Sequence, residues 1–341
     1  MRKLLSLTLC MAMVIIAFTA CSKDKSTNTG AAGGKVKTGL AVITSADKSK
    51  DATAEAEGLV QADSTAVAVL VDDKGIIVNC IIDAIQPKIK FSAAGELTTD
   101  MATVFVSKKE LGDAYGMKKN SGIGKEWFEQ AKALEDYVIG KTLEQVKGIT
   151  LNEEGAPTSA DLSSSVTISI SDYLAALEKA VNQAQALGAS SGNKLGLGMV
   201  SGLGHSAGAG DKDGLAQAYT YYGAITLDQN GKITSSIIDA SQANINFTKE
   251  GKITSDLTAE IKTKNELGDA YGMKKASGIG KEWYEQAKAF SDYILGKTLA
   301  DVKAIALNEE GSPTAADLTA SVTVGIGDFL TVIEKAGAAA K

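Results

Sequence analysis

Short runs of apolar and β-branched residues alternate with glycine-containing turns along most of the chain, and this pattern predicts antiparallel hairpins. Residues 65–83 and 220–239 each contain two such runs, separated by DDKG in the first segment and by DQNG in the second. Asn-Gly between β-branched runs is a strong hairpin signal. Further strands are expected on both sides of the hairpins, at residues 37–45, 87–91, 194–202 and 244–247.

An amphipathic helix is predicted after the strands, in residues 124–140 and again in 280–296. Each segment ends in a glycine, which is a typical helix stop. The opposite face of the first helix, with Glu129, Lys132 and Glu135, is expected to be solvated. The apolar stripes consist of Trp127, Ala131, Leu134 and Val138 in the first segment and of Trp283, Ala287, Phe290 and Ile294 in the second.

The order of these elements sets the expected fold class. A short amphipathic turn at residues 142–149 and a final helix near residues 171–183 follow the first long helix. Strands that precede packing helices in this way are typical of an α+β fold. We expect antiparallel hairpins and two or three packing helices in each half of the chain.

The two halves are copies of each other at a spacing of 156 residues, and we call residues related by this spacing counterparts. Residues 111–147 and 267–303 are identical at 29 of 37 positions. A fixed period held without insertion indicates a domain duplication. The small residues between the copies favour independent motion of two domains. The expected boundaries are 37–183 for the first domain, 184–193 for the linker and 194–341 for the second domain.

Residues 1–20 have the features of a secretory signal, with a basic start, an apolar run and small residues before Cys21. Their FTAC ending and the polar SKDKSTNTG that follows resemble the lipobox region of bacterial lipoproteins. The resemblance implies a diacylglycerol thioether on Cys21 and anchoring in the lipid bilayer, at the outer face of the cell membrane. Residues 21–36 would then be a flexible tether. An ordinary signal peptide with a free cysteine is the alternative.

Composition excludes several classes of function. The 341 residues carry a net charge of −6, which disfavours nucleic acid as a partner. The one histidine lies in a glycine- and serine-rich region, so no nucleophile–His–acid set is expected, and no P-loop or GxGxxG glycine loop is present; a stand-alone enzyme is therefore not expected. No metal site is expected either. The acidic residues Asp113, Glu126, Glu153 and Glu154 are expected to lie on the surface.

Histidine and cysteine often take part in catalysis or metal binding, but neither is expected to do so here. His205 lies in a glycine- and serine-rich region and is expected to be a solvated loop residue. Cys10 leaves with the signal and Cys21 would be lipid-modified, so Cys80 is the remaining thiol. Its counterpart is Ser236, and we expect a semi-buried strand residue without reactivity.

The segments DLSSSVTISI, residues 161–170, and DLTASVTVGI, residues 317–326, hold the candidate functional residues. In each, an aspartate stands six residues before a threonine that opens a β-branched run. We expect Thr167 and Thr323 to open a strand, with the hydroxyl at the strand edge. The simpler explanation is that these threonines only suit the pleat of a strand.

D-x-x-S-S-V-T and D-x-x-A-S-V-T resemble the D-x-x-[ST]-G-A-[ST] signature of FMN-binding domains, which receive FMN covalently on the last Thr or Ser from a flavin transferase. With KELGDAYGMKK or NELGDAYGMKK, IGKEW and GKT in each copy, the chain resembles the tandem flavinylated lipoproteins of Gram-positive flavin-based extracellular electron transfer, also described as peptide-pheromone-encoding lipoproteins. Two features depart from the signature: Ser-Val replaces Gly-Ala in both copies, and Ala320 replaces the hydroxyl of Ser164. The second site would then load less completely.

The resemblance implies a role for each motif residue. FMN would be joined by a phosphoester bond to Thr167 and to Thr323. Asp161 and Asp317 would organise the turn or hold the Mg-bound transferase complex. The remaining FMN-binding candidates are the motif hydroxyls Ser164, Ser165 and Ser321, the phosphate-neutralising Lys118, Lys119, Lys125, Lys274, Lys275 and Lys281, and the ring-stacking Tyr115 and Tyr271. Trp127 and Trp283 could also stack, but their place on the apolar stripes favours the core.

These implications predict a membrane-anchored extracytosolic electron carrier with two covalent FMN groups. Its donor would be a membrane quinol or NADH-linked dehydrogenase, and its acceptors would be free flavins, metal oxides or extracellular reductases. The alternative is a duplicated surface lipoprotein that binds a small ligand non-covalently. A third hypothesis, compatible with the first, is release of residues 12–20 as a peptide pheromone.

Overall fold

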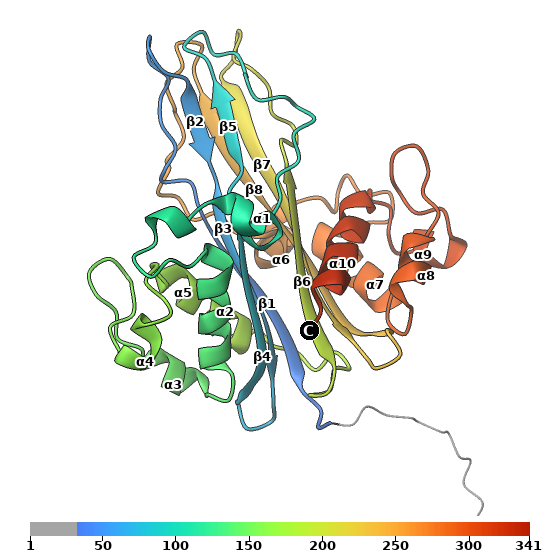
Figure 1. Ribbon diagram of the computed structural model, residues 1–341. Helices are drawn as coiled ribbons and strands as arrows, with labels where there is room; N and C mark the ends of the chain where they lie inside the picture. Colours follow the sequence, from blue (N-terminus) through green and yellow to red (C-terminus); the bar gives the residue numbers. More distant parts are fainter. Residues whose placement is uncertain (1–32) are drawn as a thin grey trace, which may run out of the picture. The chain divides into compact units, whose positions relative to one another are not determined.

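Two three-stranded antiparallel sheets form the framework of residues 33–341, the part of the chain that this computed structural model describes (Figure 1). The strand orders are β1-β3-β4 and β6-β7-β8, and β2 pairs with β5. The predicted hairpins are confirmed as β3–β4 and β7–β8. The strands are β1 (Lys37–Ser45), β2 (Gly58–Gln61), β3 (Asp63–Val71), β4 (Ile77–Ile85), β5 (Lys88–Phe91), β6 (Lys194–Gly202), β7 (Gly214–Leu227) and β8 (Ile233–Phe247).

Helices follow the strands in both halves, which confirms the α+β class. In Figure 1 the green helices pack on β1, β3 and β4, and the orange and red ones pack on β6, β7 and β8. The first half has α1 (Lys108–Leu111), η1 (Gly112–Tyr115), η2 (Lys118–Asn120), α2 (Trp127–Val138), α3 (Leu143–Lys147), α4 (Ala160–Ser163) and α5 (Ser171–Asn182). The second has α6 (Lys264–Leu267), η3 (Gly268–Tyr271), α7 (Trp283–Tyr293), α8 (Leu299–Lys303), α9 (Ala316–Thr319) and α10 (Gly327–Ala339).

Predictions about the N-terminus fall largely outside these residues. The signal peptide, the lipidation of Cys21 and most of the tether lie in residues 1–32, which are not described. Lys35 and Val36, expected in the tether, are ordered parts of the fold: Lys35 bridges to Ser190, and the Val36 N–H donates to the Ala189 carbonyl at 3.2 Å. Within residues 33–341, no helix has both the length and the apolar content needed to cross a membrane.

Helix α2 forms where the periodicity predicts it. It begins after Glu126, whose backbone N–H donates to the Glu129 carboxylate at 2.8 Å, and its apolar stripe is buried against β4. Gly140, just beyond its end, has a φ of 83°, which favours glycine. The core formed there includes Leu134 and Val166, both at most 1% exposed. Truncating such a residue to alanine costs about 2–5 kcal/mol.

The two halves share hydrophobic core. One shared cluster contains Leu70 and Ile81 from the first half and Leu195 and Tyr222 from the second. Another contains residues of β5 together with residues of β7 and β8. A common core of this kind is incompatible with the independent domain motion expected from the composition of the linker.

The segment between the halves is also held in place. Gln185 exchanges two backbone hydrogen bonds with Thr38, at 2.8 and 2.9 Å. Gly188 has a φ of 110°, and a Cβ atom at this position would lie 2.7 Å from the Thr234 carbonyl oxygen. The small residues of this segment therefore serve close packing against β8, which is why composition alone gave the wrong expectation.

Two ion pairs cross between the halves in a reciprocal arrangement. Lys179 pairs with Glu266, and Lys335 pairs with Glu110. Lys335 is the counterpart of Lys179, and Glu266 is the counterpart of Glu110. Reciprocal contacts of this kind characterise a two-fold related interface. The halves therefore pack as a pseudo-symmetric pair within one chain.

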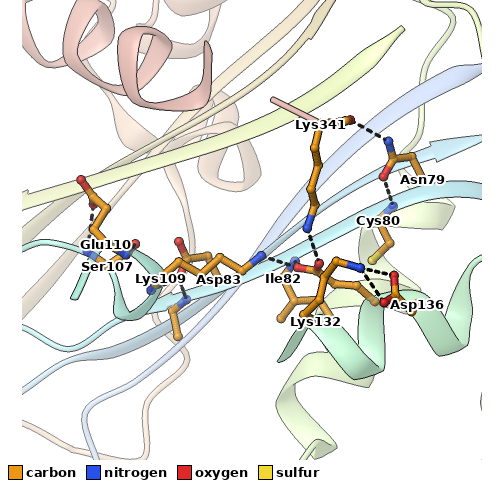
Figure 2. A network of polar contacts seen from close by, with 12 residues as sticks. Asn79, Cys80, Ile82, Asp83, Ser107, Lys109, Glu110, Lys132, Asp136 and Lys341 are labelled. Atoms are coloured by element: carbon orange, nitrogen blue, oxygen red, sulfur yellow. Dashed lines mark hydrogen bonds and ion pairs between the residues drawn. The ribbon is translucent and has the colours of Figure 1, made fainter. Parts of the chain in front are cut away.

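One further polar network crosses this interface without a symmetric equivalent (Figure 2). Glu135 on α2 is fully buried, which corrects the expectation that it is solvated. Its carboxylate accepts the Ile82 N–H at 2.8 Å, the Lys341 ammonium at 2.8 Å, and the Lys109 ammonium. Two cations and a backbone donor compensate the buried charge, so Lys341, in the second half, stabilises a carboxylate of the first.

Candidate functional site

Thr167 lies in the loop between α4 and α5, Thr323 lies in the corresponding loop between α9 and α10, and both side chains are exposed. The predicted strand is therefore wrong. The β-branched run serves the helical core, because Val166 and Ile170 are fully buried. The Ile170 N–H donates to the Gly155 carbonyl at 2.8 Å, so this backbone is bonded within loops and pairs with no strand of the described chain.

A buried glutamine on the neighbouring helix holds each threonine loop. Gln130 on α2 accepts the Thr167 N–H at 2.8 Å, the Thr167 hydroxyl at 3.3 Å and the Ile168 N–H at 3.2 Å. Gln286 on α7 accepts the N–H and hydroxyl of Thr323 at the same two distances, 2.8 and 3.3 Å. Both glutamines have 0% exposure. Sequence reasoning missed them; the available signal was the E-Q-A triplet that occupies the same place in both helices.

The same glutamines connect the threonine loops to the lysine-bearing segments. Gln130 donates from Nε2 to the Ser121 hydroxyl at 3.2 Å and to the Lys125 carbonyl at 3.4 Å. Gln286 makes the equivalent contacts with Ser277 and Lys281, at 3.2 and 3.3 Å. In each half, one glutamine side chain therefore contacts both the threonine and the lysine-bearing segment, which is residues 116–125 in the first half and 272–281 in the second.

A buried glutamate fixes the start of each lysine-bearing segment. Glu126 is 2% exposed and accepts the backbone N–H groups of Met117 at 2.9 Å and Lys118 at 2.8 Å. Glu282 makes the same two bonds in the second half. The expectation that Glu126 lies on the surface is wrong because its carboxylate is needed to cap this loop. Asp113, Glu153 and Glu154 are exposed, as are the side chains of Lys118, Lys119, Lys274 and Lys275, whereas Lys125 and Lys281 are half-buried.

Asp161 and Asp317 lie exposed in the first turns of α4 and α9. Partial burial and then the neighbouring aspartate raise the pKa of Tyr137 beside Asp161 and of Tyr293 beside Asp317. The nearby Ser159 hydroxyl is the main cause that lowers the pKa of Asp161. Both aspartates thus sit at the turn before their threonine loop. The motif serines are exposed or half-buried: Ser164, Ser165 and Ser321.

A cavity lies beside each threonine loop. The second has a volume of about 460 Å³ and is bordered by Val324, the residue after Thr323. The first has a volume of about 200 Å³ and is bordered by Ser169, two residues after Thr167. Four aromatic side chains line the second cavity: Tyr219, Tyr221, Tyr271 and Trp283.

A buried lysine faces the second cavity. Lys264 is 3% exposed, and its Nζ lies 4.5 Å from the ring centroid of Tyr219, 4.4 Å from that of Tyr271 and 4.9 Å from that of Trp283. Burial lowers the pKa of Lys264 to about 7. The surrounding rings partly replace the hydration that the ammonium group loses.

Its counterpart, Lys108, faces the first cavity. Its Nζ lies 4.8 Å from the centroid of Tyr115 and 5.2 Å from that of Trp127, and burial lowers its pKa to about 8. Sequence reasoning missed both lysines, although each directly follows the Ser or Thr of a capping box that occurs in both copies. Tyr115 does not line the first cavity; its hydroxyl donates to Gln86 at 3.1 Å.

The remaining candidates behave as expected. Cys80 lies in β4 with 1% exposure, and burial raises the pKa of its thiol, so it is not a ready nucleophile. His205 is exposed. Trp127 and Trp283 are core residues, 2% and 3% exposed, and Trp283 also contributes to the wall of the second cavity.

The arrangement suits one kind of ligand chemistry. An exposed hydroxyl is held in a fixed loop, and the cavity beside it offers a cation and, in the second half, electron-rich rings. Aromatic faces accept planar rings by stacking, and a desolvated lysine attracts electron-rich or anionic atoms. The second half therefore offers a stacking surface for a planar ring beside an exposed hydroxyl, and the first half offers the hydroxyl and the buried lysine.

Comparison with known proteins identifies no family. No family model matches the chain, and no solved structure matches it. A segment of 41 residues is 54% identical to part of a chlorophenol reductase from Desulfitobacterium hafniense. That segment spans 12% of this chain and 12% of the reductase, so the similarity covers a small part of either protein.

Proposed function

We propose that the protein is an extracytosolic electron carrier with FMN joined covalently to Thr167 and to Thr323. The observation that carries the proposal is the same in both halves. An exposed threonine hydroxyl is held by a buried glutamine at 3.3 Å, beside a cavity that contains a buried lysine. A threonine that only suited a strand would need neither the exposure nor this fixed loop.

The residues present fit the attachment of FMN. In each transfer the threonine Oγ would bond to the FMN phosphorus of an FMN-containing dinucleotide donor; the phosphoanhydride bond of that donor breaks, its mononucleotide leaves, and the hydroxyl proton passes to solvent. The exposed loop gives a flavin transferase access to that oxygen. Lys118 and Lys119, with Lys274 and Lys275 in the second half, are solvated cations on the segment that the glutamine ties to the threonine loop, which suits a phosphate carrying one remaining negative charge.

The chain's own groups would tune and hold the cofactor. Bound FMN supplies reversible one- and two-electron transfer. Lys108 and Lys264 would favour extra negative charge on a nearby ring, which raises its reduction potential. Gln130 and Gln286 would fix the attachment point, so that each ring stays close to the cavity beside its threonine loop.

The proposal includes specific partners. Electrons would come from a membrane quinol- or NADH-linked donor and pass to free flavins, metal oxides or extracellular reductases, while Cys21 would anchor the protein in the bilayer at the outer face of the cell membrane. The segment shared with a protein named as a reductase supports a redox role in general terms.

One observation favours the alternative of a non-covalent ligand-binding lipoprotein. The second cavity, at about 460 Å³, lies within the range of roughly 300–1,000 Å³ that small-molecule sites occupy. This alternative predicts that ligand affinity survives replacement of both threonines.

The two functions are separated by the double variant T167A/T323A, made with the flavin transferase present. The electron-carrier proposal predicts that donor-driven reduction of an external acceptor is lost in this variant. The matched control, T167S/T323S, keeps a hydroxyl at both positions and retains activity. Unchanged acceptor reduction by the alanine variant would rule the proposal out.

A further inference from the structure

The two cavities differ at positions where the surrounding fold is the same. Tyr219 and Tyr221 line the second cavity, and their rings stack with centroids 4.6 Å apart and an interplanar angle of 23°. Their counterparts in the first cavity are Asp63 and Thr65. Asp63 forms an ion pair of 2.6 Å with Lys48, which also lines the first cavity. Four aromatic rings therefore line the second cavity, whereas the first is lined by one ring, Tyr173, and by the Asp63–Lys48 ion pair.

The second cavity is also larger than the first. The second cavity measures about 460 Å³ and the first about 200 Å³. Sites that enclose a small molecule occupy roughly 300–1,000 Å³. The second cavity is large enough to take in a planar ring system, whereas the first can contact only part of one.

The buried lysines have different surroundings as well. Lys264 lies over three aromatic rings and hydrogen-bonds to the Tyr219 hydroxyl. Lys108 shares its cavity with a second lysine, Lys48, and both cavities have two acidic residues in their lining: Asp63 and Asp172 in the first, Glu310 and Asp328 in the second. A ring stacked on electron-rich tyrosines is stabilised most when it is electron-poor, and a desolvated lysine nearby favours a ring that carries carbonyl or anionic oxygen atoms.

We infer that the second cavity is a binding site for a planar, electron-poor aromatic ring of the isoalloxazine class, which stacks on Tyr219 and Tyr271, and that the first cavity is not. The identity of the ring rests on the proposed function, but binding itself requires no ester bond. The two flavins of the carrier would thus differ: the one on Thr323 is stacked and shielded, and the one on Thr167 is solvated.

The first test uses the full chain produced without a flavin transferase, titrated with riboflavin, which has no phosphate and cannot form the ester. We expect one riboflavin bound per chain, with its fluorescence quenched by the tyrosines. Y219L should weaken binding about tenfold, the equivalent of one lost aromatic stack. Y219F, which keeps the ring, and Y115L, at the counterpart of Tyr271, should bind like the wild type. Y271L, which removes the other stacking ring, should weaken binding in the same way and covers the case in which Y219L fails to fold.

Absence of riboflavin binding would overturn the inference, as would equal losses in Y115L and Y219L. Neither result depends on whether the threonines are modified, which a separate mass measurement decides. Covalent loading without riboflavin binding would leave the proposed function intact and remove the ring site. Riboflavin binding to a chain whose threonines are unmodified in its native membrane would leave the ring site intact and remove the proposed function.

The second test uses protein loaded by the transferase at one site only. In T167A the flavin is on Thr323, and in T323A it is on Thr167. We expect the fluorescence yield of loaded T167A to be several-fold lower than that of loaded T323A, and Y219L in the T167A background to raise it. Equal yields from the two singly loaded proteins would contradict the inference.

Discussion

Phe91 and Phe247 stack face to face, with ring centroids 4.2 Å apart and an interplanar angle of 16°, and each is the counterpart of the other. A residue that stacks on its own counterpart lies at the pseudo-two-fold axis of the two halves. Both rings have 0% exposure and belong to a core cluster drawn from both halves. The stability of one half is therefore coupled to that of the other.

Replacing one of these rings should destabilise the whole fold. F247A is expected to lower the free energy of unfolding by about 3–5 kcal/mol, because it removes a buried aromatic ring and leaves a cavity. The unfolding transition should remain single when followed by calorimetry and by tryptophan fluorescence. V104A, at an exposed apolar position, is the control and should have little effect. Two separate transitions in the wild type would contradict the shared core.

Removing the glutamine that holds a threonine loop should act on that loop alone. Q130A is expected to lower the FMN occupancy of Thr167 and to leave Thr323 unaffected, because the loop loses the acceptor for two N–H groups and a hydroxyl. Peptide mass spectrometry after a short reaction with the transferase measures both occupancies. Q145A, which changes an exposed glutamine at the start of α3, should alter neither. Equal loading of the two threonines in Q130A would count against a positioning role.

Asp239 should make the stability of the protein depend on pH. Burial raises its pKa from 3.8 to about 7, so the folded protein holds this proton more tightly than the unfolded chain does. Its contribution to the free energy of unfolding therefore falls as pH rises from about 4 to about 7. Glu266 adds to the raised pKa, while hydrogen bonds from Thr263 and Asn265 oppose it.

The test of this pH dependence is urea unfolding of the wild type and D239N at several pH values. The free energy of D239N relative to the wild type should increase by several kcal/mol between pH 4 and pH 8, at about 1.4 kcal/mol per pKa unit. The Asp239 carboxylate raises the pKa of Lys264, which burial lowers to about 7, so the difference between the two proteins measures these coupled groups together. D211N, at an exposed aspartate, is the control and should track the wild type. A difference that does not vary with pH would show that Asp239 stays ionised.

The buried lysine of the second cavity should raise the reduction potential of a flavin on Thr323. In the T167A background, K264M is expected to lower that potential by roughly 30–60 mV, which corresponds to a tenfold change in equilibrium for a two- or one-electron couple. Spectroelectrochemical titration measures it. K262M, two residues earlier at an exposed position, should leave the potential unchanged. No shift in K264M would mean that the ring does not approach Lys264.

Much of the fold could be predicted from local patterns. The hairpins, the stripe of Trp127 and Leu134, and the final helices were found because a period of two or of 3.6 residues is visible in the sequence itself. The strand predicted at Thr167 was wrong because Val166 and Ile170 face a helical core, and β-branched residues suit either environment. The contacts between the halves could not be predicted, since they depend on residues far apart in the sequence.

The site was predicted only in part. The threonines, aspartates and exposed lysines belong to a recognisable motif, and the structure places the threonine loops next to the lysine-bearing segments. Gln130 and Lys108 were missed because a buried polar side chain on an amphipathic element looks, in sequence, like an ordinary solvated residue. Its role becomes visible only when its partners are known.

The central claim is that both threonines carry covalent FMN, and one measurement addresses it directly: intact mass and visible absorbance after denaturation, on protein taken from its native membrane. We predict a yellow colour that survives denaturation, with the mass of one FMN group added to the peptide containing Thr167 and to the peptide containing Thr323. A colourless chain of unmodified mass from the same source would contradict the claim.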